Sequence, residues 1–361
     1  MTGRLRVLCL VPYPTLVASS RLRVEQYAPA LAALGIDLEV SRYFDDRGYD
    51  ELQQPGNILP KIAAMVRGLV RRGGDVLRAK RYDVALIHRE AVPVGPPFIE
   101  RLLRARGIPY VYDFDDAIFM SPPYSVIRGW SRLRYSGRVA GIARGAAAVV
   151  VGNEFLAAVA RGWNRRVIVI PTPVDTERFR PRAGPRPDGP FVLGWVGSPT
   201  TAPYLRLLDA PLAELSERHD IVLRCVGGTY THPTARVEVW PYSLDHEPDD
   251  VATFDVGLLP EPDDPWARGK AAFKAILYMA TGVPVVASRV GANPAVAPDG
   301  EVGFCVGDEG WVAAIDQLIG DAALRDRFAK AGVARAQRRY SIDALAPALA
   351  EVLRAATRTN E

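Results

Sequence analysis

Short apolar runs alternate with longer amphipathic stretches along most of the chain. Uninterrupted apolar runs of this length are typical of parallel strands that helices cover on both faces. In the first half these runs are residues 6–11, 37–40, 83–88, 109–114, 147–152 and 167–171. After the first run, a helical stretch over 21–35 places Val24, Tyr27, Leu31 and Leu34 on one face and ends at Gly35. The alternation predicts a doubly wound α/β domain.

The pattern stops once and then starts again. Residues 181–190, PRAGPRPDGP, contain four Pro and two Gly, a composition that interrupts helices and strands. The apolar runs that follow are residues 191–197, 220–228, 236–240, 254–260, 283–288 and 302–306. Helices are expected over 203–217, over 268–281 and through most of 308–357. This restart predicts a second α/β domain.

We therefore divide the chain into four parts. They are an N-terminal α/β domain (1–175), a linker (176–190), a second α/β domain (191–340) and a C-terminal helix (341–361) that packs back on the first domain. Two such domains place a cleft between the carboxyl ends of their sheets, where ligands of open α/β sheets bind. Functional side chains are expected in the loops that follow strands.

Length and composition agree with this organisation. A chain of 361 residues fits two domains, and 48% hydrophobic with 24% charged residues is the range of a soluble globular protein. No apolar run approaches the roughly 18 residues of a membrane span. Cys9, Cys225 and Cys305 lie far apart in apolar runs, which indicates core thiols of a reducing cytoplasm. Five of the 45 cations are Lys, as in a protein of a GC-rich bacterial genome.

Charge is distributed unevenly along the chain. Cations outnumber acids in residues 1–180, and acids outnumber cations in the remainder. Two basic amphipathic stretches, 59–81 and 127–145, stand out, and the first has seven Lys and Arg with a single Asp. Each is either a solvated face or a peripheral contact with an anionic membrane. Nucleic acid is disfavoured as a partner because aromatic positions for stacking are sparse.

The most informative segment begins at the predicted helix over 268–281. Arg268, Lys270 and Lys274 lie at its start, and the two lysines are four residues apart, which predicts one shared face. A helix N-terminus with cations beside it suits a diphosphate. The helix dipole disfavours cations there, so we expect an anionic ligand or a compensating acid such as Asp263 or Asp264. A solvated basic face is the alternative.

A second cluster is acidic. Asp113 and Asp115 are two residues apart at the end of a predicted strand and so point the same way, and Asp116 adds a third carboxylate. Carboxylates at the end of a buried strand are costly unless they are solvated, paired or bound to metal. Three interpretations remain: contacts with acceptor hydroxyl groups, a helix cap with arginine ion pairs, or a divalent metal site.

Other loops after strands add weaker candidates. Ser19 and Ser20 are expected to cap a helix whose first turn holds Arg21. His88 ends a predicted strand, either as a functional residue or as an ordinary surface or core residue. In the second half the candidates are Gly227 and Gly228, which suit close approach to a nucleotide, and Trp240 and Tyr242, which either flank a base or pack in the core.

Residues 268–306, which include the strings YMATGVPVVAS and VGFCV, resemble the nucleotide-sugar signature of family 4 (group 1) glycosyltransferases. Residues 17–35, 170–181, 193–208 and 254–270 resemble other loops and strand exits of that family. The resemblance runs from about residue 6 to 340 and implies the GT-B fold, in which two Rossmann-like domains face each other across a cleft. It implies transfer of a sugar from a nucleotide-diphosphate sugar, with retention and with no metal or other cofactor. The acceptor would be a glycan or a lipid-linked sugar of cell-surface polysaccharide or glycolipid synthesis, handled in the cytoplasm at the inner membrane face.

The chain also departs from the family pattern. Two family glutamates eight residues apart correspond to Gly269 and Leu277, and a family arginine corresponds to Ser198, with no lysine following it through residue 206. The position of a family histidine holds Asp115. We expect Lys270 and Lys274 to neutralise the leaving diphosphate in place of the missing groups, since charge stabilisation is commonly the largest catalytic contribution.

The resemblance assigns each candidate a role. Catalytic roles fall to Asp113, Asp115, Lys270 and Lys274. Donor binding falls to Gly197, Ser198, Gly227, Gly228, Trp240, Tyr242, Arg268, Gly269, Lys270, Lys274 and Leu277. Acceptor binding falls to Ser19, Ser20, Arg21, His88 and Asp116. A non-catalytic nucleotide- or glycan-binding homologue is the main alternative, and a sugar-nucleotide epimerase or a magnesium-dependent phosphatase using Asp113 and Asp115 is the next.

Overall fold

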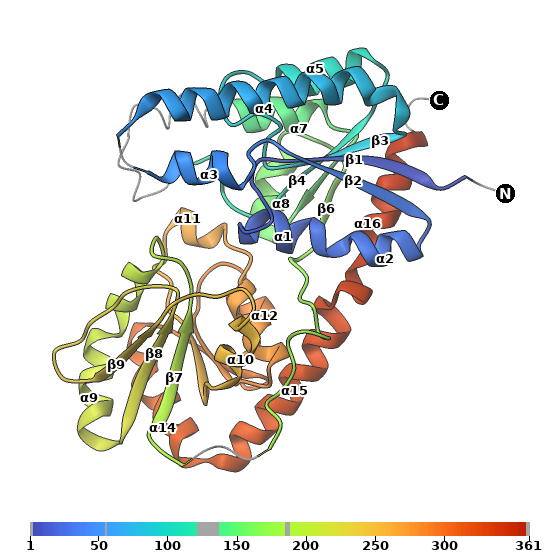
Figure 1. Ribbon diagram of the computed structural model, residues 1–361. Helices are drawn as coiled ribbons and strands as arrows, with labels where there is room; N and C mark the ends of the chain where they lie inside the picture. The colour runs from blue at the N-terminus through green and yellow to red at the C-terminus, as the bar shows by residue number, and fades with distance from the viewer. Residues whose placement is uncertain (1–2, 55, 121–136, 185–187, 359–361) are drawn as a thin grey trace. The chain divides into compact units, whose positions relative to one another are not determined.

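The computed structural model describes residues 3–358 except for residues 55, 121–136 and 185–187. Contacts divide the chain into two compact units (Figure 1). The N-terminal unit comprises residues 1–173 and 342–361, and the C-terminal unit comprises residues 174–341. Each unit is an α/β fold with its own parallel sheet, and each is described by itself below.

The N-terminal unit contains a six-stranded parallel sheet of order β2-β1-β3-β4-β5-β6. Its strands are β1 (Leu5–Val11), β2 (Ile36–Arg42), β3 (Val84–His88), β4 (Tyr110–Phe114), β5 (Ala148–Val151) and β6 (Val167–Val169). Its helices include α1 (Ala18–Arg23), α2 (Ala28–Ala33), α3 (Asp46–Gln53), α4 (Ile58–Arg78), α5 (Phe98–Ala105), α7 (Arg138–Gly145), α8 (Glu154–Arg161) and α16 (Ile342–Thr357). Figure 1 shows α4 and α5 on one face of this sheet and α2 and α16 on the other.

The helix expected over 21–35 is interrupted. The structure has α1, a 3-10 turn over Glu25–Tyr27 and then α2. Pro29 in the first turn of α2 explains the break, because it cannot donate a backbone hydrogen bond to the preceding turn. The predicted apolar face is nevertheless buried at Val24, Tyr27 and Leu31.

The C-terminal unit contains a second six-stranded parallel sheet, of order β12-β11-β10-β7-β8-β9. Its strands are β7 (Phe191–Val196), β8 (Ile221–Val226), β9 (Arg236–Trp240), β10 (Val256–Leu259), β11 (Val285–Ser288) and β12 (Gly303–Val306). Its helices include α9 (Asp209–Arg218), α10 (Glu247–Ala252), α11 (Pro265–Arg268), α12 (Phe273–Ala280), α13 (Asn293–Val296), α14 (Trp311–Gly320) and α15 (Ala322–Tyr340).

Strand order reverses once in each sheet, and this positions the ligand sites. The reversal lies between β1 and β3 in the N-terminal unit and between β7 and β10 in the C-terminal unit. Open parallel sheets bind ligands at the carboxyl ends of the strands beside such a reversal. The residues to inspect are therefore those that follow β1, β3 and β4, and those that follow β7, β8 and β10.

The expected single helix over 268–281 is wrong. α11 ends at Arg268, residues 269–272 form a turn, and α12 begins at Phe273. Ala272 adopts a left-handed backbone conformation with φ of 54°, which a continuous helix cannot contain. Lys270 therefore precedes α12 while Lys274 lies in its first turn, and the two lysines do not share one helix face. The segment expected at 203–217 is likewise a 3-10 stretch, Ala202–Leu208, followed by α9.

The expected linker and the C-terminal helix each pack with one of the two units. The segment expected as a linker belongs to the C-terminal unit, where Phe179 is buried in the core. Val174, which was expected in the first domain, also belongs to this unit, and its backbone N donates to Tyr340 O at 2.7 Å. α16 packs with the N-terminal unit, and Leu349 and Leu353 join the core that contains β1, β3 and β4. None of the described helices is both long and apolar enough to cross a membrane.

Candidate functional site

Lys274 is the centre of a polar group in the C-terminal unit that we call the lysine cluster: Lys270, Lys274, Thr201, Gly197 and Glu261. The side chain of Lys274 is half-buried, and its Nζ donates to Thr201 Oγ1 across 3.4 Å. The same Nζ lies 4.5 Å from the centre of the fully buried Trp195 ring. No carboxylate of the described residues lies within ion-pair distance of this amine.

Burial changes the charge state of this amine. Removal from water and, to a smaller extent, repulsion from Lys270 lower the pKa of Lys274 to about 7, while the Glu261 carboxylate acts in the opposite direction. Lys270 Nζ lies 5.8 Å from the centre of the Tyr204 ring. An anion bound between the two ammonium groups would favour their charged forms, so the cluster has the electrostatics of an anion site.

Three glycines allow the strand exits to approach the amine and each other. A Cβ on Gly197 would lie 2.8 Å from Lys274 Nζ and 2.4 Å from the Trp195 ring. Gly227 has a φ of +85°, and a Cβ there would lie 2.5 Å from the Gly197 carbonyl oxygen. A Cβ on Gly228 would lie 2.7 Å from Trp195. A side chain at any of these positions would collide with Trp195, Lys274 Nζ or the Gly197 backbone, so glycine is what lets these strand exits pack so closely.

The remaining predicted donor residues lie in varied surroundings. Ser198 is exposed and bonds Thr200 across 2.7 Å. Trp240, at the end of β9, is half-buried beneath the Arg224 guanidinium at 4.0 Å. Tyr242 is 38% exposed and donates to Glu247 across 3.2 Å. These side chains are available to a ligand, although each also has a role within the protein.

Arg268 and two departures from the family pattern, Gly269 and Leu277, complete the predicted donor residues. Arg268 is exposed and paired with Asp263 across 2.7 Å, so Asp263 is the compensating acid that the sequence suggested. Asp264 instead caps α11 by accepting from Ala267 N at 2.7 Å. Gly269 is buried, and Leu277 is 2% exposed within the apolar core, where it offers a ligand no polar atom.

Glu261 and Thr201 belong to the lysine cluster but were missed from the sequence. Glu261 lies two residues after the end of β10 and is buried, with Asn293 donating to its Oε2 across 3.1 Å. Its backbone N donates to Ser288 Oγ at the end of β11. An acid in the loop that follows a buried strand was the available signal for Glu261. Thr201 gave no signal of its own, because 73 residues separate it from Lys274.

A second polar group, in the N-terminal unit, is the carboxylate cluster: Asp113, Asp115 and Asp116 with His88, Ser19, Arg23 and Arg89. Ser19 Oγ lies 2.7 Å from His88 Nε2, and His88 Nδ1 lies 2.7 Å from Asp113 Oδ2. Arg23 contacts the other side of Asp113, with Nη2 2.8 Å from Oδ1. His88 and Asp113 are both buried. Serine, histidine and aspartate thus form one hydrogen-bonded chain that ends on an arginine.

The charge of Asp113 is fully compensated. Burial alone would raise the pKa of Asp113, but the Arg23 charge and the hydrogen bond from His88 outweigh burial and lower the pKa. Asp113 is therefore ionised at neutral pH, where it accepts a hydrogen bond from His88 Nδ1. On its other side, His88 Nε2 and the Ser19 hydroxyl share a hydrogen bond.

Asp115 and Asp116 differ from Asp113 and from each other. Asp116 pairs with Arg89 across 3.0 Å. Asp115 Oδ2 accepts from Thr172 across 3.2 Å, while its buried Oδ1 has no hydrogen-bond partner in the described part of the chain. Burial and the neighbouring Asp116 charge raise the pKa of Asp115. Two of the three carboxylates, Asp113 and Asp116, are thus neutralised by arginine ion pairs. Asp115 has one oxygen atom without a hydrogen-bond partner among the described residues.

The expected capping role of Ser19 and Ser20 is wrong. α1 begins at Ala18 after Val17, so both serines lie inside the helix. Ser19 bonds His88 instead, and Ser20 is completely buried. Arg21 holds the preceding loop by donating to the carbonyl oxygens of Thr15 and Leu16. Within the described residues no three His, Cys, Asp or Glu side chains are grouped as metal ligands.

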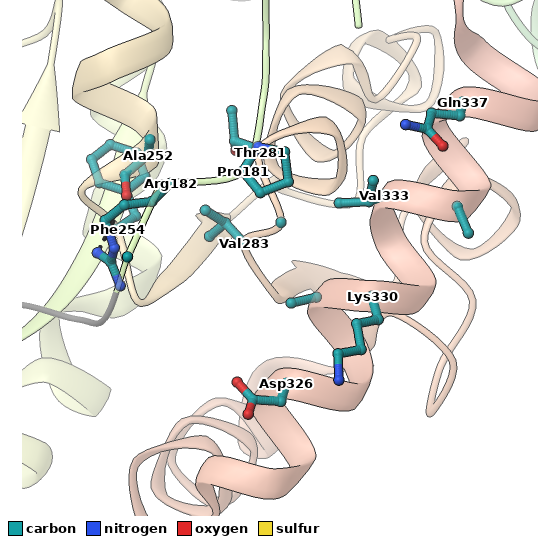
Figure 2. A pocket seen from close by; sticks show the side chains of 14 residues that line it. Pro181, Arg182, Ala252, Phe254, Thr281, Val283, Asp326, Lys330, Val333 and Gln337 are labelled. Atoms are coloured by element: carbon teal, nitrogen blue, oxygen red, sulfur yellow. Dashed lines mark hydrogen bonds between the residues drawn. The ribbon is translucent and has the colours of Figure 1, made fainter.

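A pocket of about 550 Å³ lies elsewhere in the C-terminal unit (Figure 2). Pro181, Phe254, Val283 and side chains of α15 such as Lys330 form its walls. Phe254 and Val283 precede β10 and β11, so this pocket lies at the amino ends of the strands. It contains none of the predicted site residues, and parallel sheets bind their ligands at the opposite end.

One protein-family model matches part of this chain. Residues 190–321 match the model of a family described as glycosyl transferases group 1. A comparison with curated protein sequences finds no match. The matched segment contains every member of the lysine cluster.

Several solved structures share the fold over nearly the whole chain. A sucrose-phosphate synthase from Thermosynechococcus elongatus has 16% identity and a TM-score of 0.69, with 97% of this chain and 98% of that chain covered. A glycosyltransferase from Rickettsia africae has 14% identity and a TM-score of 0.71, with 98% of each chain covered. HepE from Anabaena, in complex with UDP and glucose, has 17% identity and a TM-score of 0.66, with 97% and 99% covered. The expected α/β fold class is confirmed: the chain has the GT-B fold, and its residues 190–321 carry the sequence pattern of the group 1 glycosyl transferases.

Proposed function

We propose that this protein is a glycosyltransferase that moves a hexosyl group from a nucleotide-diphosphate sugar to a glycan or lipid-linked acceptor. The single observation that carries the proposal is Lys274, a half-buried amine without an ion-pair partner among the described residues, inside the segment that matches the transferase family. The proposed setting is bacterial cell-surface polysaccharide or glycolipid synthesis in the cytoplasm.

The lysine cluster has the chemistry to hold the donor diphosphate. Lys270 and Lys274 supply two positive charges where negative charge develops on the leaving group, and preorganised charge of this kind stabilises the transition state. Gly197, Gly227 and Gly228 let backbone approach the nucleotide. The two lysines would thereby supply the positive charge that the family places at the position of Ser198 and in the loop after it.

The carboxylate cluster offers an acceptor contact. Asp115 Oδ1 is an unpartnered acceptor atom among the described residues, and it can orient a sugar hydroxyl by accepting its hydrogen bond. The raised pKa of Asp115 also makes this carboxylate a better proton acceptor. In the proposed retaining reaction, the acceptor oxygen attacks the face from which the diphosphate departs, and the departing diphosphate takes the acceptor proton.

Asp113 is poorly suited to the phosphatase alternative. A phosphatase nucleophile must leave its carboxylate oxygens free to attack phosphorus, whereas both oxygens of Asp113 are held by Arg23 and His88. The magnesium-dependent alternative therefore loses its nucleophile. The transferase, a sugar-nucleotide epimerase and a non-catalytic nucleotide- or glycan-binding homologue remain, and analysis of the reaction products separates them.

Ligand-induced stabilisation tests the proposal. The purified protein is heated with UDP, GDP, dTDP or ADP, each free and as a sugar conjugate. UDP is the first candidate, because HepE from Anabaena was solved with UDP-glucose. A ligand at 100 times its Kd adds about 2.7 kcal/mol of stability. We expect a shift with one nucleotide that is lost in Lys274→Met and kept in Lys330→Met, which changes a lysine of α15. No shift with any nucleotide contradicts the proposal.

Product analysis then separates catalysis from binding. Incubation with the stabilising nucleotide-sugar should release free nucleotide, and the anomeric configuration of the product should match that of the donor. Binding without release favours the non-catalytic homologue, and an inverted product overturns the proposed stereochemistry.

A further inference from the structure

Helix α4 exposes an unusual amount of apolar surface. Of thirteen large apolar residues exposed in the described part of the chain, seven lie on this one helix. We call them the α4 stripe: Ile58, Leu59, Ile62, Val66, Leu69, Val70 and Leu77. At about 100° per residue they fall within an arc of about 120°. Scattered exposed apolar residues need no explanation, but a contiguous stripe along 21 residues indicates a contact surface.

The orientation of α4 is set by polar residues on its buried side. Arg72 is completely buried; it pairs with Asp75 across 2.9 Å and donates to the carbonyl oxygens of Ala91 and Val11. Gly68 packs under Tyr43, where a Cβ would lie 2.4 Å from the ring. A surface helix usually buries its apolar face, and α4 does the reverse. Rotating the helix to hide the stripe would break the Arg72 network, so the exposure is built into the fold.

Cations surround the stripe. Lys61, Arg67, Arg71 and Arg78 lie on α4, and Lys80 and Arg81 follow it. Asp75 is the one acid between residues 58 and 81, and it is buried and paired. Arg67, Arg71 and Arg78 contact acids of neighbouring elements. Lys61, Lys80 and Arg81 have no ion-pair partner in the residues that the structure describes. The rim of the stripe is therefore positive.

We propose that α4 docks the N-terminal unit on an anionic lipid surface, with the stripe in the acyl boundary and the flanking cations among the headgroups. A helix of 21 residues is about 31 Å long, enough to lie in the interface along its whole length. A second copy of the chain is a poorer occupant, because pairing two stripes would bring the same cations together. On this lipid surface the transferase would meet a lipid-linked acceptor. The meeting with the acceptor rests on the proposed function, whereas the contact of α4 with lipid does not.

The second basic stretch is excluded from this surface as far as it is described. Residues 127–136 lie outside the described residues. The rest forms α7, in which Arg138, Val139, Ile142 and Ala143 are buried. The described part of this stretch, residues 138–145, therefore turns its apolar residues inward and offers no exposed apolar stripe, and the expected membrane contact through 127–145 stays a prediction. α4 alone carries the proposal.

Vesicle flotation with the full-length protein tests it. We expect binding to phosphatidylcholine vesicles containing 30 mol% phosphatidylglycerol, weaker binding to pure phosphatidylcholine, and weakening by salt, because charge attraction is screened. The variant Ile62→Glu/Val66→Glu/Val70→Glu should lower vesicle partitioning by at least about tenfold, since each change removes apolar contact and adds repulsion. The matched control Leu16→Glu/Leu102→Glu/Leu207→Glu changes three exposed apolar residues outside α4 and should bind normally.

The outcomes are separable from those of the donor assay. Both triple variants should keep the parent melting temperature, since all six side chains are exposed. Failure of parent protein to bind anionic vesicles overturns the lipid proposal, as does equal binding to neutral vesicles or equal loss in the control variant. A dimer that dissociates in the α4 variant, without vesicle binding, assigns the stripe to a second copy instead. Nucleotide-induced stabilisation uses no vesicles, so either proposal can fail alone.

Discussion

The lysine cluster and the carboxylate cluster lie at the carboxyl ends of similar parallel sheets, yet their charges are compensated differently. Asp113 and Asp116 are matched by Arg23 and Arg89. Lys274, by contrast, meets one neutral hydroxyl at 3.4 Å, the repulsion of a second lysine and the weaker attraction of the Glu261 carboxylate, and it forms no ion pair within the described residues. A charge that is fully paired within the protein holds the fold together, whereas a charge left without a counterion is poised for a ligand. The comparison assigns structural work mainly to the carboxylate cluster and ligand work to the lysine cluster.

The largest expected effect separates Asp113 from Asp115. Asp113→Asn leaves the buried Arg23 without its carboxylate, and breaking a buried pair costs about 3–5 kcal/mol. Asp115→Asn removes no ion pair and should change stability much less while it slows transfer. Urea unfolding of the two variants measures the difference. Equal stability would show that Arg23 and Asp113 do not anchor the fold, and the contrast between the clusters would fail.

Next in size is the loss of the Lys274 charge. Lys274→Met should lower kcat/KM about 100- to 1000-fold, as removal of one preorganised electrostatic contact does in other enzymes. Unfolding stability should stay the same or rise, because a half-buried amine is replaced by an apolar side chain. Initial rates with the donor identified by stabilisation provide the measurement, with Lys330→Met as the matched lysine control. A loss of rate that follows a loss of stability would instead make Lys274 structural.

The pH dependence sharpens the same point. Since burial holds the pKa of Lys274 at about 7, donor affinity should decrease by up to about tenfold per pH unit above that value. Stability should change in the other direction. The unfolded chain keeps its lysine protonated up to about pH 10.4, so between pH 7 and that value unfolding takes up a proton and stability rises with pH. Affinity and unfolding are measured from pH 6 to 9.5, and both slopes should diminish in Lys274→Met.

The smallest expected effect belongs to Arg268. Its side chain is exposed and already paired with Asp263, so Arg268→Ala should change kcat/KM by less than about threefold. The same assay measures it beside Lys270→Ala, for which we expect a loss of about tenfold or more. If Arg268 matters more than Lys270, the donor diphosphate lies nearer α11 than the lysine cluster.

Local sequence pattern predicted much of this architecture. Alternating apolar runs located all twelve strands to within a few residues, since a strand covered on both faces must be apolar throughout. The placement of Lys270 and Lys274 next to a strand exit also followed from the sequence. The prediction that the two lysines share one helix face was wrong, because the left-handed conformation of Ala272 separates α11 from α12. Alanine rarely adopts this conformation, so the sequence does not indicate the break.

Contacts between distant segments were invisible to the pattern. The Arg23–Asp113 pair joins residues 90 positions apart, and Ser19 contacts His88 across 69 positions. Periodicity along α4 predicted an amphipathic helix but not which face would be buried. The tertiary structure decided which face is buried. Arg72 forms hydrogen bonds in the interior with Asp75, Ser41 and two backbone carbonyl groups, and these bonds hold the opposite, apolar face of α4 toward the solvent. The sequence by itself determined the elements and the chemistry available at their ends. Tertiary packing decided which charged side chains form ion pairs within the protein and which do not. The reason is that a charge is neutralised only by groups that the fold brings close to it.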